Sequence, residues 1–598
     1  MSDNFEHIKK PLAKITDQTY GSKKLVEFTK NEFSPRQVFK VGDNVYSAVG
    51  WALANSIMIE GKDGIIIIDT TESMQSMQEI MVEFRKITSK PVKAIIYTHF
   101  HGDHHIGTHY VIDRQKTEFP DINIEIYGHE TTAELYFDTV LTREIGHARS
   151  TRQFAILHND VPNTGKGIGP FGSHHPQDGL NIYMPTRTFS DKAKYSVAGI
   201  EFELIHTPGE TPDQITVWLP KEEVAMPGDN IYKTFPNLYA IRGSPPRNVR
   251  MWYQSLDKTR VLKAKYLVGS HTRPVIGKDE VYETLTVYRD AIKYIHDQTL
   301  RLINKGYYPG QIVASVKLPD LVAQHPFLQE HYGTVEWSVN SVFNDYLGWF
   351  SGNPQDLHPM NENERATRMA RLITYAQSQQ ICAAEVMLRE AEISHKKSYE
   401  HYLSKGKYLV TEDKWALELV DTVLQLGSLE EALSNTARQV KISALRALGV
   451  EEISANGRNY YLTCALELES NISLDQTKKA ISITIKRTPI EKVLEMFSLK
   501  VKGLECQHQK YTIGLTFLDL DKDFILTLRN SVCDVIEAGT EDENPQVRLT
   551  MRSDVYKSIM NENKNWEEEV KAGNVTVASG ALETYMKFLK CFDPLNYD

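Results

Sequence analysis

The segment Thr98–His105, THFHGDHH, gathers four potential metal ligands within six residues. His99 and His101 are two residues apart, and Asp103 and His104 follow directly. Imidazole and carboxylate are the ligands that zinc prefers where thiolates are absent, and none of the five cysteines precedes Cys382. A tight turn after a strand would let His99 and His101 face one metal while Asp103 and His104 face a second. The spacing therefore predicts a two-metal site.

The elements that must position these ligands belong to an α/β pattern. Short β-rich runs with turn residues between them predict strands at 45–50, 54–61, 64–70, 93–99, 122–128, 202–208, 214–220 and 265–271. Apolar residues at helical spacing predict a helix over 73–88, and alternation of strands with helices indicates a layered α/β domain. The segments 142–191 and 230–256 are rich in loop residues, and long loops in a compact domain are usually functional.

The pattern changes twice further along the chain. Helices are predicted at 362–377, 380–393, 414–426 and 429–448, which together indicate a helical bundle with an apolar face suited to dimerisation. From about residue 480 an α+β pattern returns. A helix at 489–499 precedes strands at 511–519, 523–530 and 546–553 and helices at 555–560 and 582–589.

The motif His-x-His-x-Asp-His after a strand resembles the signature of the metallo-β-lactamase superfamily, and further residues resemble its alkyl sulfatase branch. HTPGETPDQ is similar to the loop in which that branch uses a glutamate, here Glu210, in place of the histidine of most superfamily members. PGD places Asp229 where the family has its bridging carboxylate, usually a glutamate, and SHTRP places His271 at the last ligand of the second zinc.

The segment NLYAIRG and the arginine that follows it resemble the sulfate-binding segment of the same family. Asn237, Arg242 and Arg247 stand at the matching spacing. Two zinc ions, three carboxylates and these two arginines leave the predicted pocket positive, which would attract a small anion although the whole chain carries a net charge of -10. The charge permits a sulfate or a phosphate ester, and only the resemblance selects sulfate.

The resemblance covers essentially the whole chain and implies its architecture. It implies a metallo-β-lactamase αββα sandwich over residues 1–350, an all-α dimerisation domain over 351–480 and an α+β sterol-carrier-like domain over 481–598. The helical domain implies a homodimer. The C-terminal domain could carry a long alkyl chain or could be a structural module, and the sequence favours neither interpretation.

The implied activity is hydrolysis of alkyl sulfate esters to alcohol and inorganic sulfate by a metal-activated water. The resemblance implies two Zn²⁺ per chain, held by His99, His101, Asp103, His104, Glu210, Asp229 and His271, with Asp103 also assigned to catalysis. One alternative is a hydrolase of the same fold that acts on a phosphodiester, lactone or thioester. Another is a non-enzymatic lipid-binding protein with a relic metal site.

One position departs from the family pattern. Trp337, in the segment Gly333–Ser338, stands where characterised relatives have a histidine that is thought to assist the leaving sulfate, and tryptophan cannot transfer protons. His325, His331 and Glu336 are near in sequence only. Because sulfate leaves without much acid assistance, the departure favours cleavage of the C–O bond. His105, His109, His174, His175 and His206 receive no role, and His206 is predicted to be a core histidine with its polar atoms satisfied.

Composition excludes several classes of partner. No basic block stands out, which argues against a nucleic-acid partner. No apolar run approaches the length of a membrane span, and no apolar segment follows the first residues as in a secretory signal. Five widely spaced cysteines form no disulfide framework and fit a reducing compartment. We therefore expect a cytoplasmic protein whose partner is a small anionic ester.

Overall fold

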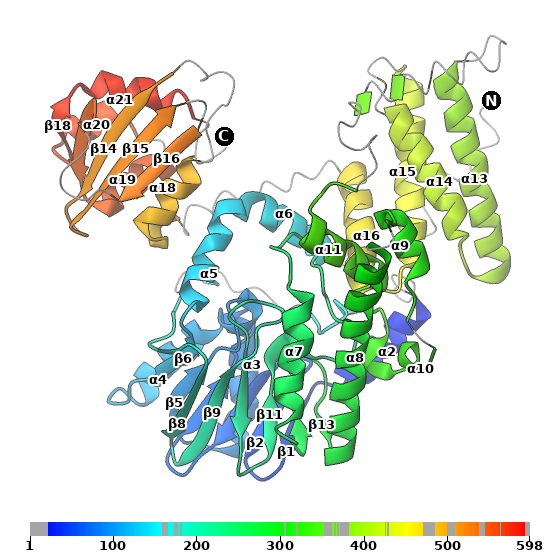
Figure 1. Cartoon of the computed structure of the whole chain (residues 1–598), viewed down its shortest axis with the longest axis horizontal. Helices are drawn as coiled ribbons and strands as arrows, with labels where there is room; N and C mark the ends of the chain where they lie inside the picture. Colours follow the sequence, from blue (N-terminus) through cyan, green and yellow to red (C-terminus); the bar gives the residue numbers. More distant parts are fainter. Residues whose placement is uncertain are drawn as a thin grey trace. The chain divides into compact units, whose positions relative to one another are not determined.

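The chain forms two compact units. The structure, a computed structural model, describes residues 22–592 except 158–164, 173–177, 180–181, 304–305, 319, 352–361, 364–365, 368–369, 371–381, 425, 427–429, 471–484, 499–508, 530–531, 538–543 and 563. The larger unit comprises Met1–Thr132 and Arg149–Ser473, and the smaller comprises Ala133–Ala148 and Leu474–Asp598. Figure 1 labels the helices and strands of both units.

Two mixed sheets form the first part of the larger unit. The seven-stranded sheet has the order β1-β2-β3-β4-β5-β6-β7 and becomes parallel from β4 onward. The six-stranded sheet has the order β13-β12-β11-β10-β9-β8 and is antiparallel except between β11 and β12. Their strands are β1 (Gln37–Val41), β2 (Val45–Val49), β3 (Ser56–Glu60), β4 (Ile65–Ile68), β5 (Val92–Ile96), β6 (Glu125–His129), β7 (Arg187–Phe189), β8 (Lys192–Val197), β9 (Ile200–His206), β10 (Ile215–Leu219), β11 (Val224–Met226), β12 (Tyr266–Leu267) and β13 (Val275–Ile276).

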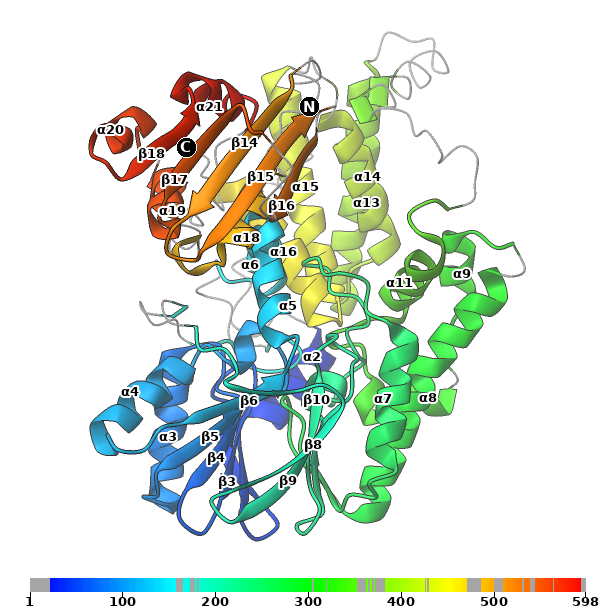
Figure 2. The same cartoon turned by 60° about the vertical axis from the view of Figure 1, so that its left-hand side comes forward.

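Strand β4 shows why the sheets stack as they do. Side chains alternate between the faces of a strand, and a strand that is buried on both faces needs apolar residues throughout. Ile66 and Ile68 pack into the core between the two sheets, whereas Ile65 and Ile67 pack beneath helix α3 (Met74–Ile87). Helices α7 (Val249–Arg260) and α8 (Lys278–Ile303) cover the outer face of the other sheet. These four layers, visible in Figure 2, confirm the predicted αββα sandwich.

Helix α3 agrees with its prediction at both ends, because Ser73 caps its start and Thr88 its end. Both segments that are rich in loop residues also contain helical residues. Helix α6 (Arg143–Gln153) lies within 142–191, and α7 begins inside 230–256 and continues past its end to Arg260. Helix α7 begins at the N-cap Asn248 and buries Trp252 and Leu256 against the sheet, so tertiary burial stabilises a helix where the sequence reads as loop.

The rest of the larger unit is helical. It contains α2 (Lys23–Phe33), α4 (Thr108–Glu118), α9 (Pro309–Ser315), α10 (Asp320–Ala323), α11 (Val335–Leu347), α13 (Ala383–Lys405), α14 (Val410–Leu424), α15 (Glu431–Glu451) and α16 (Ala455–Ser470). Helix α5 (Thr132–Asp138) belongs to the smaller unit except for its first residue. Helices α13 to α16 pack each on the next, which confirms the helical domain and its last three predicted helices. Most of the predicted helix 362–377 lies outside the described residues. Within the described part of the chain, no helix has the length and apolar character needed to cross a membrane.

The smaller unit is an α+β domain. Its five-stranded sheet has the order β16-β15-β14-β17-β18, and its helices include α19, α20 and α21. Its elements are α18 (Ile490–Ser498), β14 (Tyr511–Phe517), β15 (Lys522–Arg529), β16 (Val532–Glu537), β17 (Val547–Met551), α19 (Ser553–Glu562), α20 (Trp566–Lys571), β18 (Val575–Gly580) and α21 (Leu582–Leu589). Val140, from the inserted segment Ala133–Ala148, is buried in its core beside Ile490 and Val493. The sequence reveals no sign of this insertion.

Candidate metal centre

All seven predicted ligands lie in loops at one edge of the sandwich. His99 and His101 follow strand β5, and Asp103 and His104 form the short helix η1 (Gly102–His104) that comes next. The other ligands come from the second sheet. Glu210 lies in the loop between β9 and β10, Asp229 in the short helix η3 (Gly228–Asn230) after β11, and His271 four residues after the end of β12. Loops from both sheets therefore bring together residues that are more than 170 positions apart in the sequence.

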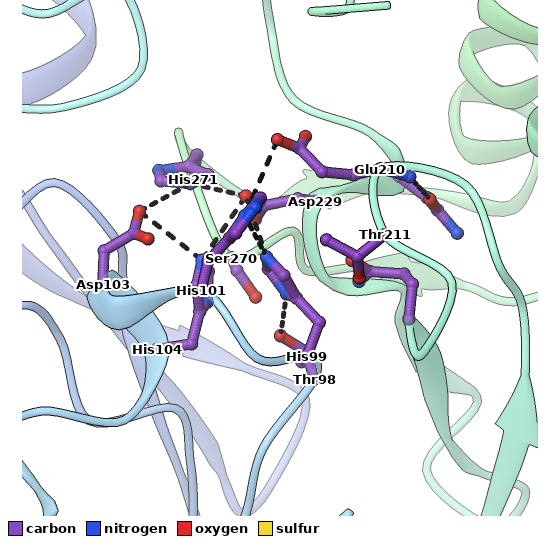
Figure 3. A network of polar contacts seen from close by, with 12 residues as sticks. Thr98, His99, His101, Asp103, His104, Glu210, Thr211, Asp229, Ser270 and His271 are labelled. Atoms are coloured by element: carbon purple, nitrogen blue, oxygen red, sulfur yellow. Dashed lines mark hydrogen bonds and ion pairs between the residues drawn. The ribbon is translucent and has the colours of Figure 1, made fainter. Parts of the chain in front are cut away.

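The first ligand group contains His99, His101, Glu210 and Asp229. His99 Nε2 lies 2.9 Å from His101 Nδ1 and 3.8 Å from Asp229 Oδ2. His101 Nδ1 lies 3.9 Å from Glu210 Oε1. The ligand atoms of His99, His101 and Asp229 lie close enough to one another to hold one metal ion, and Glu210 faces this group beside His101 (Figure 3). They are a donor set that suits zinc.

The second ligand group contains Asp103, His104, His271 and Asp229. Asp229 Oδ2 lies 3.0 Å from His271 Nε2 and 3.4 Å from His104 Nε2. Asp103 Oδ2 lies 3.5 Å from His104 Nε2 and 3.7 Å from His271 Nε2. Asp229 is the residue that the two groups share, so one carboxylate oxygen faces both (Figure 3).

Unsatisfied polar atoms show that these residues fit metal ions. His104 Nε2, Glu210 Oε2 and Asp229 Oδ1 are buried and have no hydrogen-bond partner. A buried polar atom without a partner costs about 1–3 kcal/mol, so a native structure rarely leaves three such atoms together. Metal coordination would satisfy them, because both carboxylate oxygens and an imidazole nitrogen that releases its proton each offer a lone pair.

Burial sets the protonation of the first ligand group. It lowers the pKa of both His99 and His101 well below the usual value, and neighbouring cationic groups lower the pKa of each further. Both imidazoles are therefore neutral near pH 7 and can act as ligands. Burial also raises the pKa of Glu210 to about 7, although the charge of Arg247 opposes the rise.

Carboxylates dominate the second ligand group. Burial would lower the pKa of His104 and His271, but the charges of Asp229 and Asp103 outweigh it and raise both. Burial would likewise raise the pKa of Asp103 and Asp229, yet the neighbouring imidazoles lower both. The carboxylates are thus ionised, and they concentrate negative charge where a cation would bind.

Asp69 orients the histidines and was missed at the level of sequence. Its Oδ2 accepts hydrogen bonds from His104 Nδ1 at 2.8 Å, from Thr98 Oγ1 at 2.8 Å and from Ser270 Oγ at 2.7 Å. Thr98 Oγ1 in turn lies 3.0 Å from His99 Nδ1. These bonds place the ring protons on Nδ1 and leave Nε2 free for a metal. The signal for Asp69 that the sequence offered was an aspartate directly after a strand made only of isoleucines.

The backbone of Leu53 orients His271 in the same way. His271 Nδ1 donates to Leu53 O at 2.6 Å, which leaves Nε2 for the ligand group. Glu72 fixes this backbone, because its carboxylate accepts from Leu53 N at 3.0 Å and from Gly172 N at 2.6 Å. Burial raises the pKa of Glu72 to about 7. The sequence contained no signal for either residue.

The three predicted anion-binding residues lie beside the first ligand group. Arg242 Nη2 is 3.3 Å from His101 Nε2, and Arg247 Nη2 is 2.7 Å from Glu210 Oε1. Arg247 also donates to Asn237 O. The side-chain amide of Asn237 and Nε of Arg247 are buried and have no hydrogen-bond partner. These unsatisfied donors fit an anion. Arg247 is more deeply buried than anion binding by itself requires.

Trp337 lies in the first turn of α11, next to this anion-binding segment. Gly333, just before the helix, packs so closely on Pro236 that an added Cβ would lie 2.0 Å from the carbonyl oxygen. None of the three residues near Trp337 in sequence has a described contact with a ligand group. His325 caps a short helix, His331 stacks on Phe28 with ring centroids 4.5 Å apart, and Glu336 is exposed.

The histidines without a predicted role have structural partners where they are described. His105 Nε2 lies 3.1 Å from Phe100 O, and His109 Nε2 lies 3.1 Å from Asp113 Oδ2. His206 Nε2 lies 2.7 Å from Pro212 O, so its polar contact is satisfied, but its side chain is half-buried and is not in the core. His174 and His175 lie outside the described residues.

Three family models match the chain. The metallo-β-lactamase superfamily matches residues 49–271, the alkyl sulfatase dimerisation family matches 308–471, and the alkyl sulfatase C-terminal family matches 479–598. The order of the three agrees with the order of the structural parts described above.

Curated proteins and solved structures match over nearly the whole length. A linear primary-alkylsulfatase of Pseudomonas sp. is 31% identical over 554 residues, which cover 90% of this chain and 98% of the relative. An alkyl/aryl-sulfatase of Saccharomyces cerevisiae is 26% identical over 570 residues, covering 93% and 82%. The solved structure of a stereoselective inverting sec-alkylsulfatase from Pseudomonas sp. has a similar fold. It superimposes with a TM-score of 0.80 at 22% identity and covers 96% of this chain and 87% of that chain.

Proposed function

Because this chain belongs to the alkyl sulfatase family of the metallo-β-lactamase superfamily, we propose that it hydrolyses alkyl sulfate esters to an alcohol and inorganic sulfate. One observation on this chain's own residues supports the proposal. Two groups of ligands share Asp229, and unsatisfied donors of Asn237 and Arg247 lie beside the first of them. A site that combines cation ligands with free anion donors suits a small anionic ester.

The finer assignment is two zinc ions per chain, one in each ligand group. The first ion would be held by His99, His101, Glu210 and Asp229, and the second by Asp103, His104, His271 and Asp229. Zinc supplies, when bound, the Lewis acidity that lowers the pKa of a water molecule toward neutrality. Imidazole and carboxylate groups are ligands that zinc accepts, which supports this assignment.

The chain's own residues bind and orient the sulfate group. If His101 ligates through Nδ1, its ring proton is on Nε2, so this nitrogen cannot accept a hydrogen bond from Arg242. The planar fork of Arg242 then remains available for the oxygens of a sulfate. The amide of Asn237 and Nε of Arg247 add buried donors that have no hydrogen-bond partner of their own.

These donors favour cleavage of the C–O bond. In that reaction water attacks the carbon, the C–O bond breaks and the bonding electrons leave with sulfate, whose charge the arginines stabilise. Cleavage of the S–O bond would instead release an alcohol oxygen that needs a proton. Trp337 cannot supply one, and His325, His331 and Glu336 have no described contact with the ligand groups.

The direct test of function is sulfate release from a medium-chain primary alkyl sulfate by the zinc-loaded protein. We expect turnover that a chelator abolishes and added zinc restores. A phosphodiester, a lactone and a thioester are the controls for other reactions of this fold. Binding of two zinc ions without hydrolysis of any alkyl sulfate, primary or secondary, would contradict the proposed substrate class.

Hydrolysis in ¹⁸O-labelled water tests which bond breaks. Attack on carbon is expected to place the label in the alcohol and to leave sulfate unlabelled. Mass spectrometry of both products distinguishes the outcomes, and label found in sulfate would overturn C–O cleavage. Comparing a primary with a secondary substrate in the same experiment determines the preference, which 31% identity to a primary-alkylsulfatase and 24% identity to a secondary-alkylsulfatase leave open.

We further propose that the protein is a homodimer. The support is the match of residues 308–471 to a dimerisation family and the presence of exposed large apolar side chains on α13 and α14, namely Ile393, Leu403 and Trp415. Exposed apolar residues on a helical surface mark interaction sites when they form a patch.

The proposed location remains the cytoplasm.

A further inference from the structure

Asp213 is a buried carboxylate close to the metal centre that no predicted role includes. It lies three residues after Glu210 in the loop between β9 and β10 and has no measurable exposure. Its Oδ1 accepts from Thr211 Oγ1 at 2.6 Å, and its Oδ2 accepts from Thr132 Oγ1 at 2.8 Å. The backbone amide of Phe100 donates a further hydrogen bond to the carboxylate.

Two of these donors belong to the loops that carry the first ligand group. Phe100 lies between His99 and His101, and Thr211 directly follows Glu210. Asp213 therefore connects the histidine loop from one sheet to the glutamate loop from the other. Thr132 lies at the start of α5 and is neither a predicted ligand nor next to one in the sequence. Its hydrogen bond therefore holds the carboxylate from a third side.

Other contacts hold the same loop to a different part of the site. Asn230 Oδ1 accepts from Glu210 N at 3.2 Å, and Asn230 Nδ2 donates to Thr207 O at 2.7 Å. Asn230 neighbours Asp229, so these bonds tie Glu210 to the shared carboxylate. The bonds of Asn230 do not set the distance between Glu210 and the histidine pair. Among the described side chains, Asp213 links the glutamate loop to the histidine loop.

We propose that Asp213 is a positioning residue for the first ligand group, and that it determines the metal affinity of that group without acting on the second. The inference rests on the metal centre of the proposed function. The physical reason is that the carboxylate fixes Phe100 and Thr211 together, so that His101 Nδ1 and Glu210 Oε1 approach the same point. Partners of this kind that orient metal ligands typically contribute about 10–100-fold to metal affinity.

The chemistry of the donors makes asparagine an informative replacement. Burial raises the pKa of Asp213 to about 6, and the bonds from Thr211 and Thr132 oppose the rise, so near pH 7 it is mostly an ionised acceptor. An asparagine has one oxygen and one NH₂ group. The oxygen can accept from the Phe100 amide while a threonine hydroxyl turns to accept from the NH₂ group, but every connection loses the charge of the carboxylate and therefore weakens.

The experiment is a zinc titration of the Asp213→Asn protein against a chromophoric chelator, after removal of its metal. We expect one equivalent to bind as in wild type and the other to bind about 10–100-fold more weakly. When cobalt replaces zinc in both proteins, the absorption of only one of the two cobalt ions should differ between Asp213→Asn and wild type. The thermal unfolding midpoint of the metal-free variant should stay close to wild type, because the replacement is isosteric.

A matched pair of variants keeps the proposal testable if Asp213→Asn does not fold. Thr211→Val and Thr132→Val each replace a buried threonine by valine, which has the same shape but no hydroxyl. Only Thr211 adjoins a ligand, so Thr211→Val should weaken one equivalent and Thr132→Val neither. Equal effects of the two, or equal weakening of both equivalents, would overturn the proposal. Zinc affinity is measured without substrate, so a failure of the sulfatase assignment would leave this result intact.

Discussion

Replacing Asp229 by asparagine is expected to abolish sulfate release, because this carboxylate is shared by both ligand groups. Its Oδ2 lies within 3.8 Å of three ligand nitrogens, on His99, His104 and His271. An asparagine keeps the size but removes the charge between two cations. Loss of the several kcal/mol that metal ions supply to a transition state corresponds to about 10³-fold or more in rate. Metal analysis should find both equivalents weakened, unlike the outcome expected for Asp213.

The matched control is Asp229→Glu. The resemblance to the family implies that glutamate usually occupies this position, so the charge and the ligand type are retained with one additional methylene. Since Asp229 is almost fully buried, the longer side chain should fit with strain and keep part of the activity. An Asp229→Asn protein that binds two zinc ions and turns over like wild type would remove Asp229 from the ligand set.

The two arginines are expected to differ when each is replaced by alanine, although the sequence assigns them one role. Arg247 is 4% exposed and lies against Glu210, whose exposure is 5%. Removal of one partner of a buried pair costs about 3–5 kcal/mol, because the other charge stays buried without compensation. Arg247→Ala should therefore unfold at a lower temperature when metal is absent, and it should bind one zinc equivalent more weakly.

Arg242→Ala should leave the stability almost unchanged. Its side chain is only partly buried, and its described side-chain hydrogen-bond contact is with His101. The lost hydrogen bonds to a charged substrate are worth about 1.5–3 kcal/mol, which is about 10- to 100-fold in kcat/KM. Arg242→Lys, which keeps the charge but not the planar fork, should recover only part of this loss. Equal melting temperatures for both alanine variants would contradict the distinction between the two arginines.

Local patterns were sufficient for the secondary structure near the site. The four isoleucines of β4 and the spacing of α3 predict a strand buried on both faces and a helix on one of them, and both are observed. The helices α6 and α7 could not be predicted, since their regions have a loop-like composition. For α7, burial of Trp252 and Leu256 against the second sheet decides the conformation. Propensity is a weak signal, and tertiary burial outweighs it.

The sequence by itself predicted the candidate ligands that lie close together along the chain. His99 to His104 follow one strand, so a single turn sets their geometry, and the resemblance to a family supplied Glu210, Asp229 and His271. Only the tertiary structure decided which groups meet. It placed Asp229 between both ligand groups, paired Arg247 with Glu210, and gave Asp69 and Asp213 their positioning contacts. A sequence pattern specifies which face of each strand is buried, but the two sheets must stack before loops from distant strands come within contact distance.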